Sequence, residues 1–272
     1  MPLKVKFAGV GDWPRAALRS CADAPVLAKG LVLEGLRTAQ DLVFPHHSLD
    51  EGVRAGSTGL SPEAWSRIRF LEEPVCDGCG APFDFDMGPG VRCPACEAKP
   101  RAFARARAAC LYDEASRDLI LQFKHADRLD LARMFAAWIS RSARDLLVEA
   151  DAIVPVPMPP MRLVRRRYNQ AAEIARPLAA RLKIAYRPGL LIRKAGESQA
   201  GRSGAGRKRN VQGAFSVPDP AKVEGKRILL IDDVFTTGAT VEACARALTK
   251  AGAASVDVAV LARVRETPSL SI

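Results

Sequence analysis

Apolar residues change their spacing near residue 151, and the change separates two kinds of sequence. Before that point they recur at helical intervals over 26–44, in a short turn near 61–70, and over 115–150, where the length suits two helices. The sequence RARAACLYD at 105–113 also predicts a strand. After residue 151, apolar runs predict strands at 152–157, 189–193, 213–217, 227–232 and 255–264, and amphipathic stretches predict helices at 169–183 and 239–252.

This alternation of strands and helices predicts a parallel sheet covered by helices, and therefore an α/β fold. We expect the α/β domain to occupy residues 101–272. An N-terminal extension with a helix is expected at 1–70, and a separate cysteine-rich segment at 71–100. Residues 1–25 show no firm period and predict no element.

Charge and hydropathy narrow the class of partner. The 272 residues carry a net charge of +11, which favours an anionic partner such as a nucleotide, a phosphate, a nucleic acid or a membrane surface. Arginine-rich chains from GC-rich genomes show the same excess without such a partner. No window of about eighteen apolar residues occurs, so we expect no membrane insertion. The first twenty residues lack a long apolar stretch, and we therefore expect a cytoplasmic protein.

Four of the seven cysteines form two close pairs, Cys76 with Cys79 and Cys93 with Cys96. Two residues separate the members of each pair, and turns of this kind can surround one tetrahedral zinc ion with four thiolates. The odd total and the clustering argue against a disulfide scaffold. We predict one structural zinc, because four thiolates leave no open coordination position; the alternative is unrelated thiols or a redox pair.

Two carboxylates, Asp232 and Asp233, directly follow the apolar run 228–231 and precede the sequence TTGAT at the start of a predicted helix. A run that is apolar at every position predicts a strand buried on both faces of a parallel sheet. Ligands of open α/β sheets bind beyond the carboxyl ends of the strands, where these two residues lie. The free N–H groups at the start of the helix favour an anion. The stretch therefore suits a ligand with a phosphate at one end and hydroxyl groups or bound cations at the other.

Two other interpretations fit this stretch less well. An apolar strand ending in acidic residues also occurs in P-loop ATPases, which need a Gly-x-x-x-x-Gly-Lys-Ser/Thr loop. The nearest match begins at Gly201, has Arg207 at the lysine position and lies too late in the chain. A purely structural strand, turn and helix would leave two like charges together without a partner.

The sequence 228–240 resembles the phosphoribosyl pyrophosphate (PRPP) motif of type I phosphoribosyltransferases. The resemblance implies that Asp232 and Asp233 accept hydrogen bonds from ribose hydroxyls. It also implies that the 5′-phosphate is bound by the residues of the following loop: Thr236, Thr237, Gly238, Ala239 and Thr240. The expected ligand is PRPP with Mg²⁺, which would bridge pyrophosphate and ribose oxygens and stabilise the leaving group.

Further stretches narrow the resemblance to the ComF family, which is associated with the uptake of DNA during natural competence. Segments 154–170 and 198–215 are similar to its pyrophosphate-loop region and mobile loop, and the likeness covers roughly 35–264. It implies a type I phosphoribosyltransferase-like parallel sheet flanked by helices, with a small N-terminal zinc-ribbon region. The residues expected near pyrophosphate are Pro157, Arg162, Arg165 and Arg166, and the expected lid cations are Arg202, Arg207, Lys208 and Arg209.

The cations have a second interpretation, because the arginines at 162–167 also suit the solvated face of a helix. Lys124 likewise has two interpretations: it contacts the same ligand, or it lies on the surface. The lid at 195–210 is predicted from a Gly-rich, polar composition that cannot pack, and a closed lid would keep water from the transfer reaction.

The chain departs from the ComF pattern at several positions. The family usually has two clusters of paired cysteines, and the first is missing here. That region has only His46 and His47, without partners at metal spacing, so one zinc rather than two is expected. Pro159 stands where a histidine is common, which puts proton transfer from that point in doubt. In the lid, Arg202 and Gly204 replace residues common in the family.

The acceptor of the ribosyl group is not named by the sequence, and neither is a catalytic residue. Thr236 stands where 6-oxopurine salvage enzymes have an aspartate base, which disfavours purine salvage. Three functions remain open: a Mg²⁺-assisted PRPP-dependent transferase, a catalytically silent PRPP- or nucleotide-binding scaffold in competence, and a single-stranded DNA-binding protein that uses the basic lid. The scarcity of aromatic residues near these cations disfavours the third. Competence proteins are possible partners in each case, and the oligomeric state is open.

Overall fold

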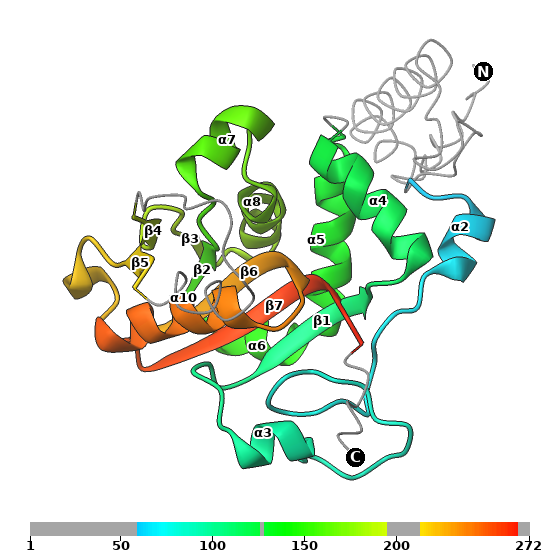
Figure 1. Ribbon diagram of the computed structural model, residues 1–272, viewed down its shortest axis with the longest axis horizontal. Helices are drawn as coiled ribbons and strands as arrows, with labels where there is room; N and C mark the ends of the chain where they lie inside the picture. The colour runs from blue at the N-terminus through cyan, green and yellow to red at the C-terminus, as the bar shows by residue number, and fades with distance from the viewer. Residues whose placement is uncertain (1–58, 126–127, 195–212, 266–272) are drawn as a thin grey trace, which may run out of the picture. The chain divides into compact units, whose positions relative to one another are not determined.

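Five parallel strands form the central sheet of the described residues, in the order β1-β7-β6-β2-β3 (Figure 1). The structure, a computed structural model, describes residues 59–125, 128–194 and 213–265, all within a unit spanning Ser48–Ile272. The strands are β1 (Ala106–Leu111), β2 (Ala152–Pro155), β3 (Ala185–Tyr186), β6 (Arg227–Phe235) and β7 (Ser255–Arg263). The predicted helix at 26–44, the histidines at 46 and 47, and the lid at 195–210 lie outside the described residues.

Helices cover both faces of this sheet, and alternate strand residues therefore belong to two separate cores. Ile153 and Leu229 pack with α4, α5, α6 and α8 on one face, whereas Val154 and Leu230 pack with α10 on the other. This double burial explains why β6 begins with a continuous apolar run. The helices are α2 (Pro62–Arg67), α3 (Pro94–Ala98), α4 (Glu114–His125), α5 (Leu131–Ser142), α6 (Arg144–Glu149), α7 (Pro160–Arg166), α8 (Gln170–Leu182) and α10 (Ala239–Lys250), with a 3-10 turn at Pro220–Lys222.

Three features of the fold differ from the sequence prediction. β4 (Ile192–Arg193) and β5 (Phe215–Ser216) form an antiparallel pair apart from the parallel sheet to which they were assigned. The stretch 115–150 holds three helices rather than two, because the backbone leaves helical geometry at Ala143 (φ −110°, ψ 26°). The fifth strand, β3, was not predicted, because its two half-buried residues form no apolar run.

The order of the strands reverses beside β2. The chain adds β3 on one side of β2 and places β6, the next strand of this sheet, on the other side. β2 ends at Pro155, which pairs with Ile231, whereas β6 continues along β7 as far as Phe235. The carboxyl end of β6 therefore extends past β2 at a topological switch point, where open α/β sheets bind their ligands.

Candidate functional site

A cavity of about 200 Å³ lies at this switch point. The chain that leaves β2 forms one wall, and the end of β6 forms another. Residues of α4, α7, α8, α10 and β4 complete the lining. Six residues that the sequence assigned to a ligand line this one cavity: Pro157, Arg162, Arg166, Asp232, Asp233 and Thr240. The structure thus brings together segments that are up to 83 positions apart in the sequence (240 minus 157).

Backbone amides and one lysine hold the two adjacent carboxylates. The N–H group of Asp233 donates to Asp232 Oδ1 at 2.9 Å, and that of Val234 donates to Asp233 Oδ1 at 2.6 Å. Lys124, near the end of α4, places its Nζ 2.8 Å from Asp233 Oδ2, and both side chains are largely buried. Asp233 therefore has a cationic partner within the protein, whereas Asp232 makes no ion pair with any described residue.

The acidity of Asp232 is strongly perturbed. Burial and the negative charge of Asp233 raise the pKa of Asp232 to about 8, although the amide of Asp233 and the charge of Lys124 act in the opposite direction. At neutral pH the Asp232 carboxyl is therefore mostly protonated without a ligand, and it can donate as well as accept a hydrogen bond. Perturbed carboxyls of this kind are common at functional sites.

Two guanidinium groups at the cavity, those of Arg162 and Arg193, have no carboxylate partner among the described residues. The Arg193 guanidinium carbon lies 5.2 Å from the centre of the Phe215 ring, and burial, together with the charge of Arg162, lowers the pKa of Arg193. Gln170 is 1% exposed, and its Nε2 atom has no hydrogen-bond partner within the described part of the chain, although its Oε1 accepts from Arg166 at 3.3 Å. Unpaired cations and a buried unpaired donor at one cavity favour an anionic ligand.

The segment predicted to be a pyrophosphate loop is a short helix instead, α7. Proline at its first position, Pro160, suits a helix start, and the helix ends where Arg167 adopts a left-handed conformation with φ 65°. Arg162 and Arg166 are four positions apart, so this helix directs both toward the cavity that they line. The side chain of Arg165 lies outside the described part of the structure.

The loop between β6 and α10 carries the predicted phosphate cradle. Gly238 has a φ of 76° and occupies the cap position of α10, so the helix start has no side-chain cap from that residue. The side chains of Thr236 and Thr237 are exposed, and Thr240 lines the cavity beside the carboxylates. A helix N-terminus with free N–H groups and nearby hydroxyls can bind a phosphate.

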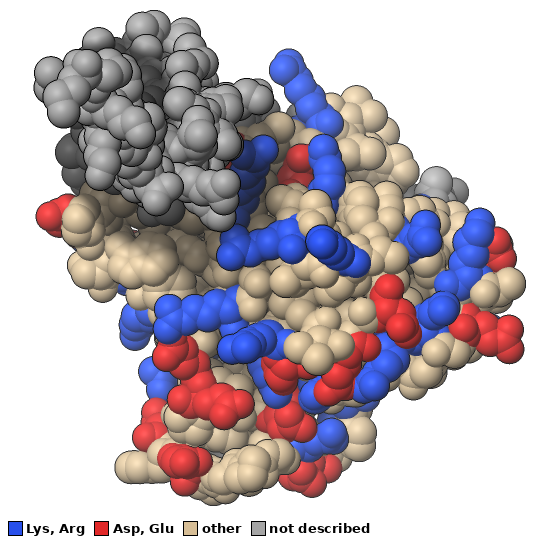
Figure 2. Space-filling view, turned by 180° about the vertical axis from the view of Figure 1, so that it is seen from behind, with Lys and Arg blue, Asp and Glu red and all other residues tan. Residues whose placement is uncertain are grey.

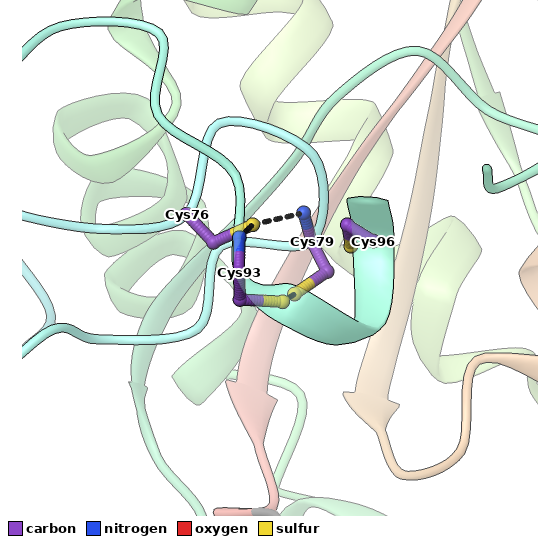
Figure 3. Close-up of side chains that lie close together, drawn as sticks. All are labelled: Cys76, Cys79, Cys93 and Cys96. Atoms are coloured by element: carbon purple, nitrogen blue, oxygen red, sulfur yellow. Dashed lines mark hydrogen bonds between the residues drawn. The ribbon is translucent and has the colours of Figure 1, made fainter. Parts of the chain in front are cut away.

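The four paired cysteines converge in a second cluster, shown in Figure 3. Their sulfur atoms all lie within 4.8 Å of one another, and Cys79 Sγ is 3.7 Å from Cys93 Sγ. Four sulfurs bound at about 2.3 Å to one tetrahedral ion are about 3.8 Å apart, so this spacing fits a four-coordinate metal such as zinc. The Cys79 side chain and the N–H groups of Cys79 and Cys93 lower the pKa of the Cys76 thiol to about 4, which favours the thiolate form that binds metal.

Surface charge is mixed on the face shown in Figure 2. Lys and Arg side chains are spread over this face with Asp and Glu among them, and acidic side chains gather toward the bottom, where the cysteine segment lies. The positive excess of the sequence therefore forms no single basic stripe on this face, as binding along a nucleic-acid backbone would require. Among the helices that the structure describes, none is long and apolar enough to cross a bilayer.

Several cavity residues had no role assigned from the sequence. Asn169 caps α8 by accepting from Ala171 N–H at 3.1 Å, and it donates to the Val156 carbonyl at 3.0 Å, which fixes the chain leaving β2. Asn before an amphipathic stretch is an N-cap signal that could have identified it. Gln170 and Arg193 gave no signal, because their importance depends on burial and on neighbours from other elements.

Comparisons with known proteins agree with this geometry. A family model described as the phosphoribosyl transferase domain matches residues 168–271. The DNA utilization protein YhgH of Escherichia coli (strain K12) is 31% identical over 204 residues, which are 73% of this chain and 88% of that protein. Competence protein F of Haemophilus influenzae is 29% identical over 218 residues, 78% of this chain and 93% of that protein.

Among solved structures, glutamine PRPP amidotransferase from B. subtilis, complexed with ADP and GMP, is 30% identical with a TM-score of 0.33. That likeness covers 49% of this chain and 25% of the other. The relatives that align over most of their own length carry more weight, and they agree with the match to the phosphoribosyl transferase domain. The chain therefore belongs to the ComF family of proteins with a phosphoribosyltransferase-like fold.

Proposed function

We propose that the protein binds PRPP with Mg²⁺ and transfers ribose 5-phosphate to an acceptor. One observation carries the proposal: two adjacent carboxylates line a single cavity beside the start of α10, together with two guanidiniums that have no carboxylate partner in the ranges that the structure describes. PRPP carries hydroxyl groups, a phosphate and a pyrophosphate, and it matches these three features. The matched phosphoribosyl transferase domain supports the proposal, since its range includes both carboxylates and α10.

Each part of PRPP has a counterpart in the site. Asp232 and Asp233 would bind the ribose hydroxyls, and the loop 236–240 would bind the 5′-phosphate. Arg162 and Arg193 would face the pyrophosphate, and Gln170 Nε2 would donate a further hydrogen bond. As pyrophosphate leaves, its negative charge grows, and fixed guanidiniums stabilise that charge. Mg²⁺, which prefers hard oxygen ligands, would neutralise the pyrophosphate when bound.

Lys124 fits a role in the same site. Its ammonium neutralises Asp233 while the ligand is absent. When ribose hydroxyls donate to Asp233, the carboxylate shares its oxygens between donors, and Lys124 Nζ can turn to a pyrophosphate oxygen within the same cavity. The lysine would thereby keep the acidic pair stable in both states, because a buried carboxylate without a partner is costly.

The remaining assignments extend this proposal to the rest of the chain. We propose one zinc ion at the cysteine cluster, with a structural role, because four thiolates close its coordination sphere. The segment 195–210 would act as the lid, and Pro157 and Arg165 would belong to the pyrophosphate region. The proposed boundaries are 1–70 for the extension, 71–100 for the zinc ribbon and 101–272 for the transferase-like domain. We place the protein in the cytoplasm.

The names of the relatives, DNA utilization protein and competence protein, concern DNA. We propose that this chain acts in the same setting, with competence proteins or single-stranded DNA as partners. A catalytically silent PRPP-binding scaffold is the second candidate. Thr236 favours it, because a threonine cannot act as the base that purine salvage enzymes have at that position.

Pyrophosphate release separates these functions. The full-length protein is incubated with PRPP, Mg²⁺ and a panel of bases, nucleosides and amines, and pyrophosphate is measured for the wild type and for Asp232→Asn/Asp233→Asn. A transferase releases pyrophosphate only with a suitable acceptor, and the double variant does not. Binding of PRPP without release for any acceptor supports the scaffold. Strongly salt-dependent binding of single-stranded DNA that PRPP does not affect, without binding of PRPP, contradicts both.

A further inference from the structure

Phe235 lies directly beneath the turn of the proposed phosphate loop. Its side chain is 2% exposed, and a Cβ atom placed on Gly238 would lie 2.6 Å from Phe235 Cζ. The backbone of the loop thus rests on the Phe235 ring with no room for a side chain between them. The position of this ring therefore sets the position of the N–H groups at the start of α10.

The ring of Phe235 is held from its other side by residues that contact or adjoin the cysteine segment. The Arg263 guanidinium, on a residue only 1% exposed, lies 5.4 Å from the ring centre and donates a hydrogen bond to the Cys79 carbonyl. Phe103, which follows the cysteine segment, packs edge-on against Phe235 with ring centres 6.1 Å apart. A chain of contacts therefore runs from Cys79 through Arg263 and Phe235 to Gly238.

A second connection reaches the same loop. Arg101, five positions after Cys96, donates to Glu242 Oε1 at 3.1 Å, and both side chains are mostly buried. Glu242 lies in the first turn of α10, and its own N–H group donates to the Gly238 carbonyl at 2.9 Å. Both connections thus start at the cysteine cluster and end within residues 238–242.

The connection from Cys79 to Gly238 depends on the fold of the cysteine segment, because it passes through the buried guanidinium of Arg263. Among the described residues, Arg263 Nε has no hydrogen-bond partner, and the guanidinium donates to the Cys79 carbonyl. Loss of this acceptor would leave a buried cation with a further unsatisfied donor, which costs free energy. The cysteine turn that presents this carbonyl has few apolar residues in its own core, and a segment of this kind folds when its thiolates bind metal. If the turn unfolded without metal, Arg263 would need water or another acceptor, and the Phe235 ring would lose this support.

We infer that the metal-bound cysteine cluster positions the phosphate loop, with Arg263 and Phe235 as positioning residues, and that metal occupancy thereby raises the affinity of the loop for a sugar phosphate. The inference rests on the proposed function, because it takes 236–240 as the phosphate site. It assigns the cysteine segment a part in ligand binding in addition to its own folding.

Arg263→Met tests the connection in the full-length, zinc-loaded protein. Methionine keeps an apolar side chain over the ring and removes the donor. We expect ribose 5-phosphate to bind about tenfold more weakly by calorimetry, which corresponds to about 1.4 kcal/mol, with zinc content unchanged. The matched control is Arg107→Met. Arg107 is also buried and donates to Asp77 of the same segment at 3.0 Å, but it does not contact Phe235, so its affinity should change less than twofold.

Hydrogen exchange at the amides of 236–242 measures how firmly this loop is held, and it needs no ligand. We expect Arg263→Met and zinc removal by a chelator to increase exchange there, while the central amides of β6 and α8 stay protected. Unchanged exchange and unchanged affinity in folded Arg263→Met would overturn the inference. If the wild type binds neither ribose 5-phosphate nor PRPP, the proposed function fails, and the exchange comparison still decides whether the cluster and the loop are coupled.

Discussion

Asp232 and Asp233 tolerate each other because each is neutralised in a different way. Lys124 pairs with Asp233, and Asp232 retains its proton near neutral pH. Neither arrangement favours the stability of the ligand-free protein, since burial of an acidic pair beside one lysine costs free energy. Ligand-binding and catalytic sites commonly contain such groups, which lower the stability of the ligand-free protein and favour binding of the ligand.

Replacing Asp232 with Asn should therefore stabilise the ligand-free protein at alkaline pH. The pKa of Asp232 is raised from 3.8 to about 8, so the folded state binds a proton more tightly than the unfolded state and loses stability as pH rises through that interval. Asp232→Asn removes this loss, and we expect a gain of several kcal/mol, up to about 5 kcal/mol, at pH 8 and little change at pH 4. Urea unfolding at both pH values measures it, and an equal effect at both would contradict the assigned pKa.

Lys124→Met should have the opposite effect on stability. The change leaves Asp233 without its partner in a largely buried position, and we expect a loss of about 2 kcal/mol near pH 7. Lys222→Met is the matched control, because Lys222 pairs with Asp219 at 3.1 Å with both side chains well exposed, and its loss should be below about 0.5 kcal/mol. Chemical denaturation compares the two variants, and equal losses would show that Lys124 is no more than a surface cation.

At the scale of elements, the decisive unit is β6 with the loop and helix that follow it. The strand runs past the end of β2, the loop turns over Phe235, and α10 begins at the turn. The turn needs glycine for two reasons at position 238: a φ of 76° and a space already filled by an aromatic ring.

Gly238→Ala should for these reasons be among the most damaging single changes in the described chain. We expect a loss of about 3 kcal/mol, since left-handed strain adds to a contact of 2.6 Å with Phe235. Gly225→Ala separates the two causes, because Gly225 has a φ of 67° and no atom within 4 Å of its added Cβ, and its loss should be near 1 kcal/mol. Thermal unfolding of both variants is the measurement, and similar losses would mean that the contact with Phe235 is unimportant.

The sequence predicted long elements well and short ones badly. The strand 227–232 and the helix 239–252 agree with β6 and α10 because their apolar spacing follows directly from burial on the sheet. The strands at 189–193 and 213–217 were placed in the wrong sheet, since two-residue pairings leave no periodic signal. A helix at α7 was only the second interpretation of its arginines, because its apolar residues face solvent and give no core-facing pattern; Met161 is 82% exposed.

In the candidate site, the sequence predicted the features that are local in the chain and not those that depend on contacts between distant elements. A motif local in sequence identified Asp232 and Asp233, and spacing alone identified the four cysteines. The pairing of Lys124 with Asp233 joins residues 109 positions apart (233 minus 124), and no local pattern reports it. The support of Gly238 by Phe235 also depends on packing between elements, which the sequence does not display.

At the scale of the whole molecule, the cysteine cluster is built onto the transferase-like domain. Arg107 of β1 donates to the Asp77 carbonyl at 3.2 Å, and a Cβ atom at Gly80 would lie 2.6 Å from the Ala106 carbonyl oxygen, so the cysteine turn rests on the edge of the sheet. The first cysteine turn and the edge strand β1 are therefore in direct contact.

Purified protein should accordingly contain one equivalent of zinc per chain. Cys76→Ser and Cys96→Ser should each lower it to near zero, because a structural site needs all four thiolates. Cys110→Ala is the control, since Cys110 is fully buried in the sheet core and outside the cluster, and it should keep the metal. Elemental analysis gives the count, and two equivalents per chain would mean that a second site exists.

The most direct measurement of the central claim is a calorimetric titration of PRPP with Mg²⁺ into the full-length wild type, Asp232→Asn/Asp233→Asn and Asp219→Asn. The last variant removes an exposed carboxylate that does not line the cavity, and it serves as the control. We expect one PRPP per chain for the wild type and for Asp219→Asn, and affinity at least about a hundredfold weaker for the double variant, which corresponds to about 2.8 kcal/mol. Equal affinity in all three proteins, or no binding to the wild type, would contradict the assignment of this cavity to PRPP.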